Sequence, residues 1–543
     1  MEKVLSLLIV TVVVAPSTAS DLSECLELAG INVTTNLIER TFENYTAYVD
    51  INFQWQERGG YRLPLAYLKV QSASDVQFAV KCARSHGLAV VARAGGHGYL
   101  KYAYGQHDDQ TLVLDLQNLN AISVDQERRI ATVEAGARLG HVAYQLWQNG
   151  NFLIPIGTCA SVGVSGYTLG GGHSLFSYLY GMGSDNVIEM EMVDANGELL
   201  TINNRTNVNL FWALRGAGVT GSFGIVTKFT YQMHAAPHQI VQGIVGFSLQ
   251  RFNEFYSVYQ TFMSENRGRP IFYGFTVHEM EVTGIFFDVQ SATEAESVSV
   301  SRIEEVLALF PSPDSQSVVM IIQFRELLTD FLRITRDYGY LKPNFNLTEP
   351  SDLMKINSYG TGTEWFKSKS FFVRKLLNPD EILALQQLLI DVSVPSIHIG
   401  AETFAGKMQD FDAQNDSVFL HRDAYYYVYI YMVREKDDDP ETSIKLNDFF
   451  ERSKEVLNHT NSYQNYPDDE MDDFLERYYG VNLQRLIDIK TDVDPDDFFN
   501  TNPQSIPVRS GSGSGYSFKN SRLKSIAISL CVFIVMTHLL QRK

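Results

Sequence analysis

Basic residues are scarce in this sequence relative to acidic ones, and that shortage narrows the range of possible partners. The 543 residues include 44 Lys and Arg against 63 Asp and Glu, which gives a formal net charge of −19. A protein that binds nucleic acid needs a basic face toward the phosphates. The composition therefore argues against a nucleic-acid partner, whereas a hydrophobic content of 45% is ample for a large buried core.

Several common site motifs are also missing. The chain has no Gly-x-x-x-x-Gly-Lys-Ser/Thr phosphate loop, no His-Glu-x-x-His and no Cys-x-x-Cys pair. The run of glycines at 170–172 lacks the spacing of a dinucleotide fingerprint. We therefore predict no Rossmann nucleotide site and no zinc or other metal site. His141, His173 and His421 are interpreted as structural rather than as ligands.

Long apolar runs are confined to the two ends of the chain. Residues 1–20 combine one Lys, an apolar run and small residues, which is typical of a secretory signal peptide. Residues 509–543 hold a Ser/Gly linker, a polar spacer and an apolar run over 526–540, the pattern of a GPI-attachment signal. The rival interpretation is a single membrane span, for which this run is short. We expect a protein that is secreted or attached to the extracellular face of the cell surface.

Secretion gives meaning to the sequons and to the few cysteines. The Asn-x-Ser/Thr sequons are candidate glycosylation sites at Asn32, Asn44, Asn204, Asn346, Asn415 and Asn458. Cys25 and Cys82 lie on segments with helical patterning near the mature N-terminus, and Cys531 falls in the C-terminal tail. Cys159 is then left unpaired, which in a secreted protein favours a chemical role.

Two glycine-rich turns carry the most informative side chains. The first is Arg93-Ala94-Gly95-Gly96-His97-Gly98, and the second is Gly157-Thr158-Cys159-Ala160-Ser161-Val162-Gly163. Backbone N–H groups in such turns can approach a phosphate or a flat ring closely. One turn offers an imidazole and the other a thiol, the two nucleophiles that a doubly attached redox cofactor would need. The alternative is a buried His and a buried Cys in two tight turns.

Hydrophobic periodicity predicts a change of architecture near residues 235–238. Before it, we expect helices over 75–85 and 139–147, and strands over 88–92, 111–115, 130–134, 187–193 and 223–231. Beyond it, strands alternate with amphipathic helices such as 302–310. This pattern predicts an antiparallel sheet covered by helices on one face.

The clearest strand of the second half runs over residues 425–432. With period two, Tyr425, Tyr427, Tyr429 and Tyr431 lie on one face. The phenols either form a half-exposed outer face or make an aromatic, hydrogen-bonding wall for a polyol. On the second interpretation Tyr425, Tyr427 and Tyr429 are candidate substrate residues.

Taken together, the motifs resemble the berberine-bridge-enzyme-like branch of the flavin-linked oxidases with the vanillyl-alcohol-oxidase (PCMH-type) fold. Each motif is weak alone, but their order and spacing cover nearly the whole mature chain. Besides the two turns, the resemblance rests on Gly183-Ser184-Asp185-Asn186-Val187, Leu210-Phe211-Trp212-Ala213-Leu214-Arg215-Gly216, Gly221-Ser222-Phe223-Gly224-Ile225-Val226, Tyr463-Gln464-Asn465-Tyr466 and Val493-Asp494-Pro495-Asp496-Asp497-Phe498-Phe499.

The resemblance implies an α+β fold with an inserted domain. A PCMH-type FAD-binding domain of two α/β subdomains would be joined by an antiparallel-sheet substrate domain covered by helices. The implied boundaries are a signal peptide at 1–20, the FAD domain at 21–235, the substrate domain at 236–455, a berberine-bridge-like segment completing the FAD domain at 456–508, and the linker and anchor at 509–543.

The resemblance also implies covalent FAD. His97 would be bonded to the flavin 8α carbon and Cys159 to C6, and Cys25 and Cys82 match the disulfide of the family. Two such substituents would raise the flavin potential and hold the ring in an open site. The remaining implied cofactor residues are Arg93, Ala94, Gly95, Gly96, Gly98, Val162, Gly163, Gly166, Gly224, Val226 and Asn465.

The reaction implied by the resemblance is two-electron oxidation of an alcohol or a sugar hemiacetal, with O2 as the acceptor. Tyr463 and Tyr466 are the candidate bases, and Glu402 resembles the acidic residue that assists the base. Alkaloid-cyclising relatives carry a catalytic Glu on the strand after the pair His421-Arg422, where this chain offers only tyrosines near Tyr429. Val162, three residues after the Cys, favours access of O2.

Three hypotheses follow from the sequence. The leading one is a secreted or surface-anchored oxidase of mono- or oligosaccharides that makes lactones and H2O2. The second is an oxidase or dehydrogenase of a secondary metabolite or of an allylic or aromatic alcohol. The third is a flavin-free surface glycoprotein that keeps the fold for binding.

Overall fold

The computed structural model describes most of the chain between residues 19 and 509. The described residues are 19–43, 45, 48, 63–100, 102–105, 110–289, 296–315, 317–329, 349–356, 365–434 and 440–509. The first 18 residues, the sequons at Asn44 and Asn346, Cys531 and residues 510–543 lie outside them. Among the helices in the described ranges, none is both long enough and apolar enough to cross a membrane.

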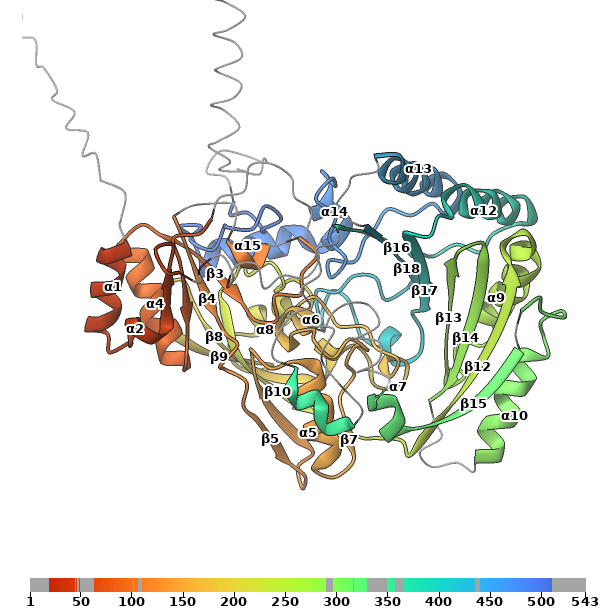
Figure 1. Ribbon diagram of the computed structural model, residues 1–543, viewed down its shortest axis with the longest axis horizontal. Coiled ribbons are helices and arrows are strands. Elements are labelled where there is room, and N and C mark those ends of the chain that lie inside the picture. The colour runs from red at the N-terminus through yellow and green to blue at the C-terminus, as the bar shows by residue number, and fades with distance from the viewer. Residues whose placement is uncertain are drawn as a thin grey trace, which may run out of the picture.

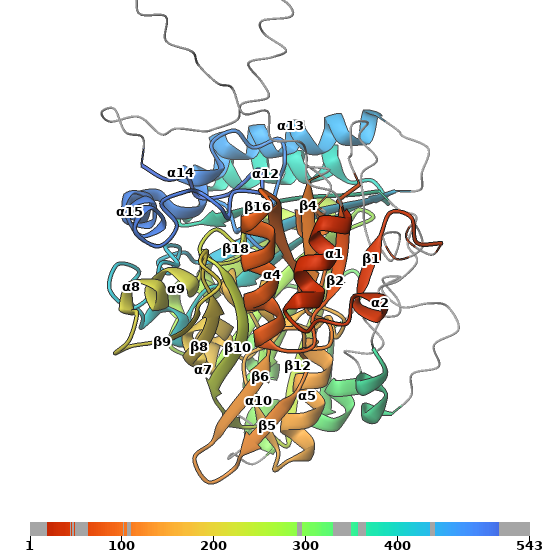
Figure 2. The same ribbon diagram turned by 90° about the vertical axis from the view of Figure 1, so that its left-hand side faces the viewer.

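The N-terminal layer is a four-stranded sheet with α1 and α4 beside it (Figure 2). The strand order is β1-β2-β4-β3, parallel except for β1. All residues of β4 are buried, as expected for a parallel strand covered on both faces. A disulfide between Cys25 and Cys82 joins α1 to α4. The bounds are α1 (Ala19–Leu28), α2 (Val33–Asn36), β1 (Leu37–Glu39), β2 (Ala66–Lys69), α4 (Ala73–Ser85), β3 (Ala89–Arg93), η1 (Tyr102–Tyr104) and β4 (Thr111–Asp115).

A second, five-stranded antiparallel sheet follows, with the order β5-β6-β10-β8-β9. Buried and partly buried side chains alternate along β6 and along the second half of β10, because one face of the sheet packs on the core. The bounds are β5 (Ile122–Asp125), β6 (Ile130–Glu134), α5 (Leu139–Gln148), β7 (Phe152–Leu153), α6 (Val164–Leu169), α7 (Ser177–Tyr180), η2 (Gly183–Asn186), β8 (Val187–Val193), β9 (Leu199–Asn203), α8 (Val208–Leu214), β10 (Ile225–Gln232) and β11 (His234–Ala235).

The third sheet is a seven-stranded antiparallel sheet with the order β15-β12-β14-β13-β17-β18-β16. Helices α9, α10, α12 and α13 lie on the side of this sheet that faces away from the other two sheets (Figure 1). An aromatic and aliphatic cluster fills the layer between sheet and helices. The bounds are β12 (Gln239–Ser248), η3 (Leu249–Arg251), α9 (Phe252–Glu265), β13 (Ile271–His278), β14 (Glu281–Asp288), α10 (Glu296–Leu307), β15 (Ser317–Gln323), η4 (Pro350–Lys355), β16 (Trp365–Val373), α12 (Pro379–Val392), β17 (Ile397–Thr403), η5 (Gly406–Gln409), β18 (Tyr426–Arg434) and α13 (Pro440–Leu457).

The C-terminal segment returns to the first half of the molecule (Figure 1). It contains α14 (Phe474–Tyr479), η6 (Gly480–Asn482) and α15 (Leu483–Val493). Its apolar residues, such as Leu486 and Ile506, belong to the same hydrophobic core as the first two sheets. The fully buried Lys490 fastens the segment, because its Nζ donates to the Ser222 carbonyl at 2.8 Å and pairs with Asp494 at 2.5 Å.

The sequence predicted the elements of the first half well. The strands at 111–115, 130–134 and 187–193 coincide with β4, β6 and β8. Several other bounds differ by one or two residues, and two differ in a way that matters for the fold. The strand expected over 223–231 begins at Ile225, because Gly224 turns at a φ of 150°. The helix expected over 302–310 is α10, which runs over Glu296–Leu307.

The buried cation of α15 gives a first prediction. Replacing Lys490 by Met leaves the Asp494 carboxylate buried without its cation, which costs about 3–5 kcal/mol of unfolding free energy. The control is Lys228→Met, because the pair of Lys228 with Glu191 is about one third exposed and contributes about 1 kcal/mol or less. Urea unfolding of the two variants beside the wild type measures both losses. Equal losses of unfolding free energy in the two variants would contradict the stabilising role of the buried Lys490.

Candidate active site

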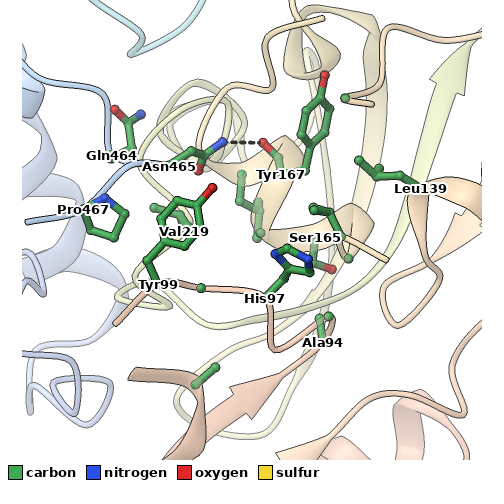
Figure 3. A pocket seen from close by; sticks show the side chains of 18 of the residues that line it. Ala94, His97, Tyr99, Leu139, Ser165, Tyr167, Val219, Gln464, Asn465 and Pro467 are labelled. Carbon is green, nitrogen blue, oxygen red and sulfur yellow. Dashed lines mark hydrogen bonds between the residues drawn. The ribbon is translucent and has the colours of Figure 1, made fainter. Parts of the chain in front are cut away.

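The central feature is a cavity of about 570 Å³ that is lined by all three sheets and by the C-terminal segment. Figure 3 shows side chains of this cavity, with Tyr99 drawn between Pro467 and His97 and the Asn465 amide hydrogen-bonded to the Tyr167 carbonyl. The first two sheets contribute mainly glycine-rich turns. The seven-stranded sheet contributes Phe272, Phe287, Glu402 and Tyr427, which face the turns across the cavity.

The two glycine-rich turns touch each other backbone to backbone. A Cβ atom placed on Gly95 would lie 2.3 Å from the Gly163 nitrogen, and one placed on Gly163 would lie 2.4 Å from Gly95. Any side chain at either position would push the turns apart. The turns that carry His97 and Cys159 are therefore held at the closest possible approach, and both residues line the cavity.

Arg138 ties the same two turns together from outside the cavity. Its buried guanidinium donates from Nη1 to the Gly95 carbonyl at 2.7 Å and to the Ser161 carbonyl at 2.6 Å. Arg93 does not line the cavity. Its side chain points the other way, forms a buried ion pair with Asp115 and lies over the ring of Tyr104. Arg93 therefore supports the first turn from behind.

The two nucleophiles of the cavity differ in their protonation. Burial and the nearby Arg138 charge lower the pKa of His97 to about 3, so its imidazole is neutral at pH 7. Its Nε2 lies 3.1 Å from the Ser161 hydroxyl. Burial raises the pKa of Cys159 to about 12, and among the described residues it is the one cysteine outside a disulfide. The site thus presents a neutral imidazole and a protonated thiol.

Other glycines of the cavity wall face open space. A Cβ atom on Gly98, Gly166 or Gly221 would have no protein atom within 4 Å. Together with the touching turns, these glycines form a smooth backbone cradle along one side of the cavity. Such a cradle suits a flat and elongated group that lies directly against the peptide chain, and a volume of about 570 Å³ is in the usual range of cofactor sites.

A three-donor site surrounds the hydroxyl of Tyr463. The hydroxyl oxygen accepts the Gly172 N–H at 3.0 Å, the His173 N–H at 3.3 Å and the Asn465 side-chain amide at 3.0 Å. Burial raises the pKa of Tyr463 to about 12, although these donors pull it downward. The three donors favour the phenolate and offset part of the effect of burial, since all of them donate to the oxygen.

The seven-stranded sheet contributes a carboxylate, that of Glu402, to the cavity. Tyr427 donates from its hydroxyl to Glu402 Oε2 at 2.9 Å, across the pair of strands β17 and β18. Tyr427 is buried, and burial beside Glu402 raises its pKa well above 10. The His173 ring, interpreted from the sequence as structural, lies in the same wall with its Nδ1 3.0 Å from Glu402 Oε2.

The other two candidate substrate tyrosines lie outside the cavity lining. Tyr429 does not line the cavity itself, but its ring stacks on Tyr466 with the centroids 5.4 Å apart. Tyr425 precedes β18 rather than belonging to it, and its ring lies under the Arg267 guanidinium, away from the cavity. Of the three candidate substrate tyrosines, Tyr427 alone lines the cavity.

Most of the residues singled out from the sequence meet here. The cavity is lined by His97, Cys159, Ala94, Gly95, Gly96, Gly98, Val162, Gly163, Gly166, Gly224, Val226, Glu402, Tyr463, Asn465 and Tyr466. Arg93, Tyr425 and Tyr429 lie outside the lining. No local motif pointed to Arg138. His173, in contrast, directly follows the run of glycines at 170–172, and that position could have marked it as a cavity residue.

Comparison with known proteins agrees with this geometry. Residues 64–203 match the family described as FAD binding domain, and residues 462–507 match the family described as berberine and berberine like. The chain is 26% identical to chitooligosaccharide oxidase of Gibberella zeae over 83% of this chain and 90% of that protein. It is 36% identical to xylooligosaccharide oxidase of Thermothelomyces thermophilus, but this match spans only 40% of this chain and 42% of that protein.

Solved structures extend the likeness over nearly the whole chain. BBE-like 1 of Physcomitrella patens superposes with a TM-score of 0.75 and 27% identity, covering 90% of this chain and 99% of that one. Xylooligosaccharide oxidase of Myceliophthora thermophila, solved with xylobiose, superposes with a TM-score of 0.76 and 26% identity, covering 90% of this chain and 100% of that one.

The fold and the glycine cradle, with these matches, define an FAD-linked oxidoreductase with a PCMH-type FAD-binding fold. Within that class the chain contains the FAD-binding and the berberine-like family domains and is similar to berberine-bridge-enzyme-like proteins. The fold class predicted from the sequence is confirmed. The disulfide that the resemblance implied between Cys25 and Cys82 is present as well.

The cradle gives a second prediction. Gly166→Ala adds a methyl group where no protein atom lies within 4 Å, within the short helix α6. Since Ala favours helix by up to about 1 kcal/mol over Gly, the flavin-free protein should unfold at the same or a higher temperature. The flavin content should nevertheless fall, because the methyl group occupies the cradle.

Gly95→Ala is the matched control, because its Cβ would collide with the Gly163 backbone at 2.3 Å and should lower the unfolding temperature itself. The ratio of flavin to protein absorbance and a thermal melt measure both effects. Full flavin content in Gly166→Ala would show that the cofactor does not lie against this glycine.

Proposed function

We propose that the protein is an FAD-dependent oxidase of carbohydrates that converts C1 of a mono- or oligosaccharide to a lactone and reduces O2 to H2O2. One observation carries the proposal. The wall opposite the FAD cradle brings together one carboxylate and several phenols, from Glu402, Tyr427, Tyr463 and Tyr466. Such a wall is both flat and hydrogen-bonding, which suits the ring and the hydroxyls of a sugar. The names of the oligosaccharide oxidases among the relatives support the same substrate class.

The two adjoining turns supply the attachment of the cofactor. His97 and Cys159 would hold FAD by two covalent bonds, through its 8α and C6 positions. The contact of Gly95 with Gly163 supports this proposal, because it keeps the two nucleophiles in one region of the cavity. When held there, FAD would supply the two-electron acceptor that the oxidation needs.

The phenol of Tyr463 is the proposed base for the substrate hydroxyl. A general base must accept a proton in its deprotonated form, and the donors from Gly172, His173 and Asn465 stabilise the phenolate of Tyr463. Among the described residues no comparable set of donors surrounds the Tyr466 hydroxyl, and its pKa is raised well above 10 by burial and by the neighbouring Tyr99. The tyrosines of β18 leave no carboxylate where ring-closing relatives carry one, which also favours polyol oxidation over cyclisation.

We also propose that the enzyme works outside the cell, secreted or attached through its C-terminal residues. The disulfide between Cys25 and Cys82 supports an oxidising compartment. The described sequons support glycosylation, because their asparagines are all exposed, namely Asn32, Asn204, Asn415 and Asn458.

A sugar screen tests the function. The purified protein is mixed with a panel of aldoses, xylo-, gluco- and chito-oligosaccharides, and with allylic and aromatic alcohols, and peroxide is measured. Peroxide and lactone from sugars support the proposal. Turnover of the alcohols alone would replace it by oxidation of secondary metabolites, and a colourless protein would indicate a flavin-free binding module.

Covalent attachment is the third prediction. Yellow colour should remain with the wild-type protein after acid precipitation and washing. It should survive both His97→Ala and Cys159→Ala, because each variant keeps one bond, and it should wash out of the double variant. Colour that washes out of the wild type would contradict both attachments.

The base is the fourth prediction. Tyr463→Phe should lower kcat/KM by roughly 10²–10⁴-fold, the usual contribution of a general base, whereas Tyr466→Phe should cost much less. Because the pKa of Tyr463 is raised to about 12, its phenolate is a minority at pH 7 and kcat/KM should increase as the pH rises. Asn465→Leu removes one donor to the phenolate and should move that profile to higher pH. An unchanged profile in this variant would argue against Tyr463 as the base.

A further inference from the structure

His173 lies at the junction of the FAD cradle and the seven-stranded sheet. Only 2% of its side chain is exposed. The ring is stacked on Phe404 at 5.6 Å, lies 5.8 Å from Phe272 and meets the edge of Tyr427 at 4.8 Å. The orientation of the imidazole is therefore fixed by packing, and each ring nitrogen has one defined neighbour.

The neighbour of Nε2 decides the tautomer. Nε2 lies 3.0 Å from the Thr403 carbonyl oxygen, which can only accept a hydrogen bond. Nε2 must therefore carry a proton. In a neutral imidazole the other nitrogen, Nδ1, would then present a lone pair.

Nδ1 faces a carboxylate oxygen. It lies 3.0 Å from Glu402 Oε2, although the ring nitrogen is not aligned for a linear hydrogen bond. Two lone pairs at this distance repel each other in a buried site, and Nδ1 has no other hydrogen-bond partner among the described residues. A proton between the two atoms removes the repulsion. The Glu402 side chain is 31% exposed, so it can turn to bring that proton into line.

The other titratable groups around this pair are phenols. Tyr427 of β18 donates to the same Glu402 oxygen at 2.9 Å. Tyr167 of α6 donates to the His173 carbonyl at 2.8 Å, and Tyr463 accepts the His173 N–H at 3.3 Å. The neighbours from β13 and from the turn after β17 are the phenylalanines at 272 and 404, which do not titrate.

We propose that His173 and Glu402 share one proton, so that His173 is a positioning residue that keeps Glu402 poised to exchange a proton with the substrate side of the cavity. The step moves only a proton, between Nδ1 and the carboxylate, and no electrons. The use of this proton in turnover rests on the proposed oxidase function, whereas the shared proton itself does not.

The first test needs no substrate. Full-length protein labelled with ¹⁵N-histidine is examined by NMR at neutral pH, and the protonated-carboxyl region is examined by infrared spectroscopy. We expect a protonated Nδ1 or a protonated carboxyl group that is absent from both His173→Gln and Glu402→Gln. Absence of both signals from the wild type, or their persistence in Glu402→Gln, would overturn the proposal whatever the enzyme oxidises.

Two substitutions of His173 separate its two contacts. Gln places its amide near the position of Nε2 and can keep the bond to Thr403, but nothing remains to share a proton with Glu402. Asn places its amide near Nδ1 and can still donate to Glu402, yet it cannot give up a proton at neutral pH. Both variants should therefore lose the shared-proton signal, and thermal unfolding checks that each is folded.

The fifth prediction is a double-mutant cycle in turnover. His173→Gln should lower kcat/KM at least about tenfold in the wild-type background and should cause no further loss in Glu402→Gln, because His173 acts through Glu402. If the losses of kcat/KM from the two single substitutions multiply in the double variant, His173 acts independently of Glu402, and the positioning role is overturned. If no substrate of the screen is oxidised, the proposed function fails while the spectroscopic result still decides on the shared proton.

Discussion

The contact between the backbones of Gly95 and Gly163 is the constraint on which the rest of the site depends. No side chain fits at either position, so the turns after β3 and before α6 meet at the distance of bare peptide groups. Arg138 holds both turns by their carbonyl groups, and Arg93 supports the first from behind. A cavity built on backbone in this way keeps its shape, because the peptide groups have no rotamers to change.

The seven-stranded sheet forms another wall of the cavity, and this wall carries acidic and phenolic side chains. One face of the sheet packs against helices through aromatic and aliphatic residues. The opposite face places Glu402 and Tyr427 next to each other on paired strands, in front of the cradle. The division follows from the two-residue period of a strand, which sends alternate side chains to opposite faces. Under the proposed function, cofactor binding and substrate chemistry therefore fall to different parts of the fold.

The sequence predicted those features that are local in the chain. The turns around His97 and Cys159 could be predicted from their glycines, and the strand of tyrosines could be predicted from its alternation. The prediction from sequence failed where a side chain reaches across the fold. Arg93 stands inside the first motif, yet its side chain leaves the cavity, and Arg138 binds Gly95 from a distant helix start. Tyr425 fits the alternation but precedes the strand, and His173 becomes informative only once β17 brings Glu402 beside it.

The order in which the cavity is assembled has a consequence for biosynthesis. Residues near both ends of the described chain line it, from Val90 to Gln504. During synthesis the cradle leaves the ribosome early, but its far wall is closed only when the C-terminal segment has docked through Lys490. Complete enclosure of the cavity is thereby coupled to completion of the chain. Products cut short before that segment would lack the part of the cavity lining between Tyr463 and Gln504.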